Sequence, residues 1–451
     1  MNRGVLIALM LAAMAGLAAC QPGRYEAGRQ AAERGDYLKA ASQWRPLAEE
    51  GEPLAQFNLG GLYAEGKGVA LDPKEAVRWY RLAADQSLAE AQYSLGRMYA
   101  AGSGIEQSHE RAAEWYRLAA EQSLPEAQFS LAALYADGQG VEQSFIKAAE
   151  WYRRAGERGH AEAQTTLGAY YEKGLGVTQD YGQAAVWWHK AAAQGHAEAQ
   201  STLGALYEKG LGVPQDYTEA ANWWRQAAEQ GHGEAQTNLG FLYSRGLGVR
   251  QDYAQAADWW RKAAFQGVPA GQTNLGVLHE KGRGVPQSYA EAVRWWQLAA
   301  AQGYPDAQHN LAYMYANGQG VPKDYAEAVK WWRLAAAKNL PIAQHYLGVM
   351  YTRGRGVPQD YREAATWHFR AADQGYAESQ LELAVLHQNG RGVPRSKVLA
   401  HVWLNLAAAN FPPGENRAIA VSRRDRLARQ MSAMQLAEAQ RLARQWRPKT
   451  P

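Results

Sequence analysis

The stretch AEAQSTLGALYEKGLGVPQDYTEAANWWRQAAEQGH (residues 197–232) decides the fold, because close copies of it fill most of the chain. One glutamine keeps the same place in every copy, and ten of them follow one another at intervals of 36 residues. A fixed period of this size indicates one small unit that is copied and stacked, because no single copy can bury its apolar face alone. We call these ten residues the key glutamines: Gln56, Gln92, Gln128, Gln164, Gln200, Gln236, Gln272, Gln308, Gln344 and Gln380.

The quoted copy predicts two helices. After Gln200, the apolar residues of segment 203–207 have the spacing of one helix face, which predicts a first helix, helix A. The glycine- and proline-containing segment 210–214 ends it. Trp223 belongs to a second apolar face, helix B, which ends at Gly231. Each copy is therefore predicted to be helix, turn, helix.

Positions in a copy are counted below from its key glutamine. Position +16 is Asp or Ser in all ten copies, and both are strong N-caps for helix B. Glu or Gln follows three residues later in seven copies, as Glu219 does, which predicts a capping box. The sequence thus carries a start signal for every B helix.

Glycine and tryptophan also recur inside the predicted helices. Position +4 is Gly in seven copies and Ala in three. Because Gly costs about 1 kcal/mol against Ala inside a helix, we expect a repeated benefit, namely close approach of a neighbouring helix backbone. Position +23 is Trp in all ten copies, from Trp79 to Trp403, and we expect it to be the large buried side chain of each B helix.

The first twenty residues differ from the rest. Arg3 precedes an apolar run, residues 5–19, that is too short to span a membrane and has the length of a secretory signal. The run ends in LAAC at Cys20, which resembles a bacterial lipobox, whose cysteine is acylated after cleavage. Gln21 follows, where members of the lipoprotein family that stay in the inner membrane have Asp, so the outer membrane is favoured. Simple cleavage after Ala19 is the alternative.

The cysteine count and the charge distribution limit which covalent links and partners are possible. Cys20 is the only cysteine, so no disulfide can form within one chain. Residues 416–451 contain nine Lys or Arg and two acidic residues, whereas the whole chain has a net charge of only +4. This basic segment could meet anionic headgroups or nucleic acid, but we interpret it as the solvated face of a helical cap. An exported protein would seldom meet nucleic acid, and none is predicted as a partner.

The copies resemble the Sel1-like repeat, a relative of the tetratricopeptide repeat, through the pattern A-Q-x-x-L-G-x-x-Y-x-x-G-x-G-V followed by D-Y-x-x-A-x-x-W-W-x-x-A-A-x-x-G. The resemblance implies an all-α fold: an α/α superhelical solenoid of about ten 36-residue helix-turn-helix repeats with terminal caps. The predicted organisation is a signal peptide (1–19) ending at Cys20, a degenerate N-terminal helical unit (24–51), ten repeats (53–411), C-terminal capping helices (414–447) and a tail (448–451).

The family implies a function as well as a fold. Its members are adaptors that gather partner proteins, so we expect a protein–protein interaction scaffold with no catalysis and no cofactor. Together with the lipobox, this predicts a lipoprotein of the bacterial envelope, most simply at the outer membrane and facing the periplasm. Alternatives are a scaffold for polysaccharide export or for host factors, and, as a minor one, a hydrolase-like enzyme. Buried Trp-Trp pairs would exclude a sugar-stacking platform at those pairs.

Two patterns that suggest chemistry have simpler interpretations. Pairs such as Gly174 and Gly176 lack the strand and third glycine of a dinucleotide loop, and we interpret them as turns. The histidines at equivalent positions of successive copies should lie about 10 Å apart, too far to share one zinc ion, so no metal site is predicted. They are His160, His196 and His232 in one group and His309 and His345 in another.

Function should lie where the copies differ. Position +1 is aromatic in the first three copies, then Thr or Ser in four, and His309, His345 and Leu381 in the last three. The first three copies also have Trp-Tyr where the next five have Trp-Trp. Aromatic side chains on helix A would make good anchors for a partner, although they could instead only pack against neighbouring repeats. The candidate partner-binding residues are Phe57, Tyr93 and Phe129, with Tyr313 and Tyr346 as a second patch.

Overall fold

The computed structural model describes residues 22–448, and this part of the chain contains only helices, joined by turns. The predicted signal, the lipobox and Cys20 lie outside the described residues. By its internal contacts the chain forms two units, residues 1–227 and 228–451, and each is an all-α, α/α solenoid. Within the described part, no helix is both long and apolar enough to cross a bilayer.

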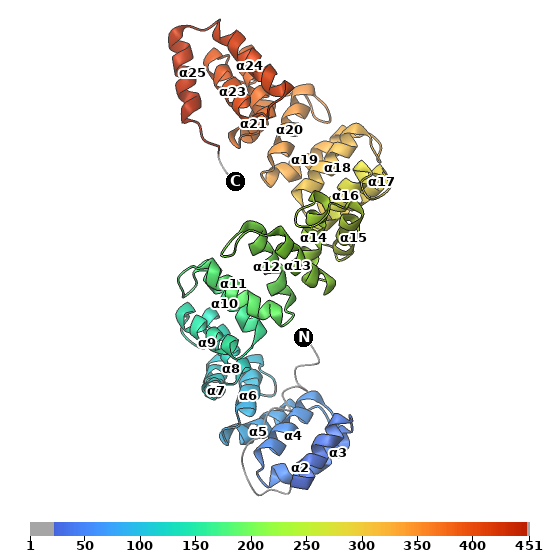
Figure 1. Cartoon of the computed structure of the whole chain (residues 1–451), viewed down its shortest axis with the longest axis vertical. Helices are drawn as coiled ribbons and strands as arrows, with labels where there is room; N and C mark the ends of the chain where they lie inside the picture. The colour runs from blue at the N-terminus through green and yellow to red at the C-terminus, as the bar shows by residue number, and fades with distance from the viewer. Residues whose placement is uncertain (1–21, 449–451) are drawn as a thin grey trace. The chain divides into compact units, whose positions relative to one another are not determined.

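The helices follow one another as hairpins along the chain (Figure 1). The first unit contains α2 (Pro22–Glu33), α3 (Tyr37–Glu49), α4 (Pro53–Glu65), α5 (Pro73–Asp85), α6 (Ala89–Ala101), α7 (His109–Glu121), α8 (Pro125–Asp137), α9 (Phe145–Glu157), α10 (Ala161–Lys173), α11 (Tyr181–Ala193), α12 (Ala197–Lys209) and most of α13 (Tyr217–Glu229). Within each unit, helix A of a repeat packs on helix B of the same repeat, and helix B packs on helix A of the next, as α10 does on α11 and α11 on α12.

The second unit begins near the end of α13 and continues the same alternation. Its remaining helices are α14 (Gly233–Arg245), α15 (Tyr253–Phe265), α16 (Pro269–Lys281), α17 (Tyr289–Ala301), α18 (Pro305–Asn317), α19 (Tyr325–Ala337), α20 (Pro341–Arg353), α21 (Tyr361–Asp373), α22 (Ala377–Asn389), α23 (Lys397–Asn410), α24 (Glu415–Ala428) and α25 (Ala433–Gln445).

Helix B begins where the sequence predicts. The Asp or Ser at position +16 accepts a hydrogen bond from a backbone N–H two or three residues later in every repeat, as Asp252 Oδ1 does from Gln255 at 3.0 Å. The predicted capping box is wrong for these helices. The N–H of the cap residue instead donates to the carbonyl oxygen of position +7 in helix A, as Asp252 does to Tyr243 at 2.9 Å. This bond fixes the turn and leaves the later Glu or Gln free of a capping role.

The Gly-x-Gly pairs form turns, as predicted. Gly174 ends α10 in the left-handed region with φ 68°, and Gly176 also has a positive φ of 66°. A Cβ atom on Gly176 would lie 2.2 Å from the carbonyl oxygen of Phe145, at the start of the preceding B helix. The second glycine therefore lets the turn touch the repeat before it, as Gly212 and Gly284 also do.

The glycine at position +4 faces an aromatic ring and not a helix backbone, which corrects the sequence-based expectation. A Cβ atom on Gly204 would lie 2.4 Å from Nε1 of Trp224 in the same repeat. Trp224 is at position +24 and is only 1 % exposed, whereas Trp223 at +23 is half-buried. The residue after the recurrent tryptophan is buried in every B helix, and where position +4 is glycine, the glycine makes room for its ring. The tryptophan at +23, expected to be the large buried side chain, is itself buried in five repeats, as Trp79 is, and half-buried in the other five.

The key glutamines join consecutive repeats. In all ten, Nε2 donates to a backbone carbonyl eight residues earlier, near the end of the preceding B helix, at 2.8 to 3.4 Å. In at least seven, Oε1 accepts at 2.7 to 3.0 Å from a Gln or Asn amide at position +30. We call this series of amide contacts the amide ladder. It explains why glutamine keeps its place, because its buried amide satisfies groups of two repeats.

Short helices cover the ends of the repeats. At the N-terminal end, Trp44 of α3 is fully buried and donates to the Tyr25 carbonyl oxygen at 3.2 Å. At the C-terminal end, α24 and α25 pack on α23 through Leu427, Ala439 and Ala443. Most arginines of these two helices point into solvent, in agreement with a solvated face.

Candidate functional site

The three aromatic residues predicted to bind a partner each pack inside their own repeat. Phe57, Tyr93 and Phe129 lie on α4, α6 and α8, and each ring contacts the tyrosine at position +24 of the same repeat. The ring centroids are 5.7, 5.6 and 5.5 Å apart. All three side chains are half-buried, so each also presents part of its ring to solvent. We call Phe57, Tyr93 and Phe129 the aromatic row.

The residues at positions +1 and +24 vary together. Where +24 is tyrosine, +1 is an aromatic residue that fills the remaining space. Where +24 is tryptophan, +1 is Thr or Ser in four repeats, and the indole Nε1 donates to the +1 carbonyl oxygen at 2.9 to 3.0 Å. The first three repeats and the next four therefore fill the space between positions +1 and +24 in two ways. The first three use an aromatic residue with a tyrosine, and the aromatic row belongs to this arrangement.

A cavity of about 540 Å³ lies between the first two repeats, beside the aromatic row. Its walls include the rings of Tyr80 and Tyr116, which contact Phe57 and Tyr93. Glu65 and Arg97 supply one charge of each sign, and Ser94 adds a hydroxyl. The tyrosines thus connect the aromatic row to the cavity.

Burial controls the protonation of these tyrosines. It is the main reason why the pKa of Tyr80 and the pKa of Tyr116 lie well above the ordinary value, with small contributions from Glu65 and Tyr93 respectively. Both hydroxyls therefore stay protonated at neutral pH and can donate hydrogen bonds into the cavity. The cavity offers tyrosine and serine hydroxyls, one cation, one carboxylate and aromatic walls, which suits a polar side chain or a short peptide segment.

The row continues to the start of the fourth repeat through a histidine. The ring of His160 stacks on Phe129 at 4.7 Å with an interplanar angle of 17°. His160 Nδ1 accepts from the Ala163 backbone N–H at 3.2 Å, so this residue caps α10. Burial lowers the pKa of His160, which keeps its ring neutral near pH 7. Sequence reasoning considered His160 as a possible metal ligand and missed its contact with Phe129.

The second predicted patch lies in the other unit. Tyr313 and Tyr346 contact each other edge to face at 6.1 Å, on α18 and α20. Tyr346 stacks on Trp332 at 5.0 Å and also contacts His309, so much of its ring is used for packing. Tyr313 remains exposed. The structure thus brings the two residues together but leaves mainly Tyr313 for a partner.

A histidine cluster lies next to this patch, and the sequence analysis missed its central member. His368 is at position +24, where five earlier repeats have tryptophan, and it is fully buried against Gly348. Ser379 Oγ lies 3.0 Å from His345 Nδ1 and 3.3 Å from His368 Nδ1. Reading position +24 across all repeats would have singled out His368.

Burial lowers the pKa of these histidines. The pKa is about 4 for His309 and His345 and about 3 for His368, with smaller contributions from His345 to the other two and from Arg353 to His345. They are therefore neutral at pH 7. In the described part of the chain, no group of three or more His, Cys, Asp or Glu side chains is arranged to hold a metal ion.

The Trp-Trp pairs are mostly inside the protein. The second tryptophan of each pair is buried, from Trp188 to Trp332. The first is buried or half-buried, and cations cover several of these rings, as Lys262 does for Trp259 at 3.8 Å. The pairs therefore offer little aromatic surface on which a sugar ring could stack, since only Trp223 and Trp331 are half-buried and the other members are buried.

Comparison with known protein families identifies the repeat. The family model of the Sel1 repeat matches ten consecutive segments of this chain. They are residues 53–88, 89–124, 125–160, 161–196, 197–232, 233–268, 269–304, 305–340, 341–376 and 377–410.

Two solved structures are similar over long stretches. The first is c5321, a protective antigen of uropathogenic Escherichia coli with an SLR fold, which is 33% identical with a TM-score of 0.63. That similarity covers 90% of this chain and 94% of that one. The second is a Sel1 repeat protein from Oxalobacter formigenes, 32% identical with a TM-score of 0.55, covering 76% of this chain and 99% of that one. A comparison with curated protein sequences gave no match.

Proposed function

Because the chain belongs to the Sel1 repeat family, we propose that it is a lipid-anchored adaptor of the bacterial envelope that holds partner proteins on its first three repeats. Repeats of this kind serve as scaffolds for protein–protein interaction, since stacked helix pairs present an extended surface. The proposal adds the anchor, the compartment and the binding site. It includes no catalytic step.

The observation that carries the binding site is the cavity beside the aromatic row. Half-buried aromatic rings next to a cavity with hydroxyl donors have the features of anchor points in protein interfaces, which favour Tyr, Trp and Arg. Phe57 and Tyr93 approach this cavity through Tyr80 and Tyr116, and Arg97 lies in its wall. A partner segment that inserts an amphipathic side chain there would bury these rings further.

The sequence around Cys20 supports the anchor. An apolar run followed by LAAC and Gln21 resembles a lipoprotein signal and favours the outer membrane. We propose that the mature chain faces the periplasm. The polysaccharide alternative has less support, because the Trp-Trp pairs are mostly buried.

The binding site can be tested by measuring partner capture with double variants that leave no cavity in the core. The residues at positions +1 and +24 of the first two repeats can be replaced by the Thr and Trp that repeats four, six and seven have there. The two double substitutions are Phe57→Thr with Tyr80→Trp and Tyr93→Thr with Tyr116→Trp. Such variants should keep their helicity and melting temperature, because Gly60 and Gly96 leave room for tryptophan as Gly204 does. We expect them to lose cross-linked partners found with the natural chain in its own bacterium. Unchanged partner capture by a folded variant would reject the site.

The anchor has its own test. In the source bacterium, Cys20→Ser should move the protein from the membrane fraction to the soluble fraction, and globomycin should cause the precursor to accumulate. Metabolic labelling with a fatty-acid analogue should mark the natural chain and not the variant. An unlabelled, freely soluble natural chain would contradict the anchor while leaving the binding site open to its separate test.

A further inference from the structure

The amide ladder is interrupted at two places. Position +30, which donates to the key glutamine in at least seven repeats, is Arg158 in the third repeat and Lys338 in the eighth. The corresponding acceptors, Gln128 Oε1 and Gln308 Oε1, are buried and have no hydrogen-bond partner. Both are accepting atoms that other repeats satisfy with a primary amide.

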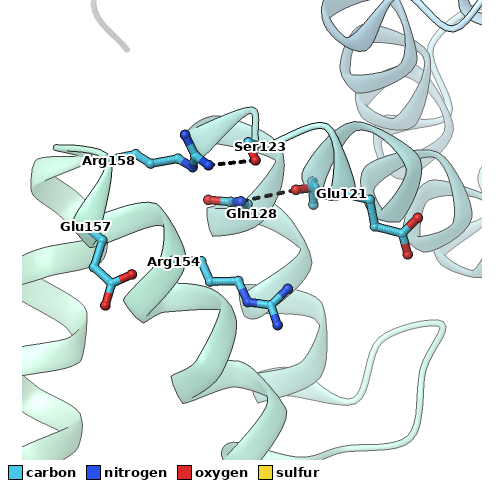
Figure 2. Close-up of a pocket in the computed structure, with 7 residues that line it drawn as sticks. Glu121, Ser123, Gln128, Arg154, Glu157 and Arg158 are labelled. Atoms are coloured by element: carbon cyan, nitrogen blue, oxygen red, sulfur yellow. Dashed lines mark hydrogen bonds between the residues drawn. The ribbon is translucent and has the colours of Figure 1, made fainter.

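At the third repeat the unpaired atom is held in place. Gln128 is 2 % exposed, and its Nε2 donates to the Ala120 carbonyl oxygen at 3.1 Å, which fixes the orientation of the side-chain amide. Arg158 does not replace the missing donor. Its Nη2 donates to Ser123 Oγ at 2.7 Å (Figure 2). A buried acceptor without a partner is rare in proteins and calls for an explanation.

A cavity of about 440 Å³ lies at this gap, and Gln128 is part of its wall. Arg154 and Arg158 line it together with Glu121 and Glu157 (Figure 2). The lining therefore carries two positive and two negative groups. An anion alone would meet both carboxylates, whereas a neutral segment with both donors and acceptors can use all four groups.

We propose that this gap is a binding site for a primary amide, namely the side chain of an Asn or Gln in an extended segment of a partner protein. The amide N–H donates to Gln128 Oε1, as Gln122 does to Gln92 and Gln194 does to Gln164 in the neighbouring repeats. The guanidinium groups of Arg154 and Arg158 donate to backbone carbonyl oxygens of the segment, and Glu121 or Glu157 accepts from its N–H groups. The partner thus supplies the missing contact of the ladder.

This site does not depend on the function proposed above. The cavity beside the aromatic row and the cavity at Gln128 share no lining residue. Loss of one site should therefore leave the other intact.

The test uses the full mature chain labelled with ²H and ¹⁵N and three capped peptides, acetyl-Gly-Xaa-Gly-methylamide with Xaa as Gln, Glu or Met. The side-chain amide signals of Gln128 are followed during titration. We expect the Gln peptide to shift these signals in a saturable way, and the Glu and Met peptides to bind at least about tenfold more weakly, because neither has a side-chain amide N–H to donate to Gln128 Oε1.

Two matched variants complete the experiment. Arg158→Gln places the chain's own amide in the gap, so it should weaken binding of the Gln peptide at least about tenfold while raising the melting temperature. Lys338→Gln fills the other gap and should raise the melting temperature without changing peptide binding. The proposal is overturned if the Gln128 signals do not move, if all three peptides act equally, or if Arg158→Gln binds as the natural chain does.

Discussion

Packing inside each repeat depends on one glycine of helix A. The indole of Trp260 lies against Gly240, and its Nε1 donates to the Thr237 carbonyl oxygen at 2.9 Å. In the eighth repeat, where position +4 is Ala312, the indole of Trp332 donates instead to His309 Nδ1 at 3.1 Å. An added methyl group at +4 is thus accompanied by a different hydrogen bond.

This comparison gives a prediction for Gly240→Ala. A Cβ atom there would lie 2.6 Å from Trp260 Nε1, so the ring must shift and lose its bond to Thr237. Overpacking costs about 1–3 kcal/mol, and the gain in helix propensity is about 1 kcal/mol. We expect a net loss of about 1 kcal/mol in unfolding free energy by urea denaturation. Adding Thr237→His should recover stability, and a gain from Gly240→Ala alone would contradict the argument.

The left-handed residues that are not glycine give a second prediction. Ser87 and Ser123 have φ of 66° and 73° where the equivalent Gly195 has 86°. Ser87→Gly should raise stability by about 1 kcal/mol, because it relieves this backbone strain. Ser123→Gly should raise it less, because it also removes the hydroxyl that accepts from Arg158 at 2.7 Å. Melting curves of the two variants would show the order, and the reverse order would refute it.

For single helices, the sequence predicts the features that depend on nearby residues and misses those that depend on distant ones. The start of every B helix could be predicted, because a side-chain cap acts within three residues of itself. The second half of the capping box could not, since the competing acceptor is a carbonyl of helix A, nine residues earlier, as Tyr243 is for Asp252. The capping-box pattern considers only residues within one helical turn, so it does not include an acceptor on another helix. The role of glycine at +4 was misjudged for the same reason, because its contact is 20 residues away.

The amide ladder joins elements that neither helix propensity nor hydrophobic period reveals. Gln236 Nε2 donates to Ala228 at 3.1 Å, and its Oε1 accepts from Gln266 at 2.9 Å. Gln236→Met should keep the volume but leave the Ala228 carbonyl and the Gln266 amide without this partner, which costs about 1–3 kcal/mol.

Hydrogen exchange would locate that cost. The amides near the Ala228 end of α13 and in α14 and α15 should exchange faster, while those of α22 and α23 stay unchanged. The matched control is Gln128→Met, which removes an unsatisfied Oε1 and should cost less. If both variants lost the same unfolding free energy, the hydrogen bond between the key glutamine and position +30 would contribute nothing to stability.

At the scale of the whole chain, the helix patterns within each copy, together with the 36-residue period, predicted a solenoid of helices, but they did not predict the cavity of the candidate site. The sequence singled out the aromatic row by its departure from the middle repeats, and the structure shows the reason, because each row residue complements a tyrosine at +24. The cavity beside it depends on how two repeats meet, which no single copy encodes. Differences among the copies therefore indicate which repeats contain the candidate site, and the packing between repeats determines whether a cavity forms there.

The last three copies differ in another way, because histidines replace both members of the +1 and +24 pair in one of them. His345 and His368 share Ser379, and His309 lies one repeat earlier. Their pKa values, about 4, 3 and 4 for His345, His368 and His309, lie below the ordinary 6.5 mainly because of burial. The folded chain thus favours the neutral rings, whereas the unfolded chain takes up protons below about pH 6.5.

The second unit should consequently lose stability in acid. Between about pH 6.5 and 4 the unfolded state binds more protons than the folded state, so the unfolding free energy falls as pH falls, by roughly 1.4 kcal/mol for each pH unit and each such histidine. Above about pH 6.5 this contribution is complete and independent of pH. The variant His345→Thr, His368→Trp, Ser379→Ala restores the residues of the middle repeats and retains only His309. Its melting temperature should fall with a shallower slope between pH 6.5 and 4, and an identical slope in the two proteins would show that the cluster does not control acid unfolding.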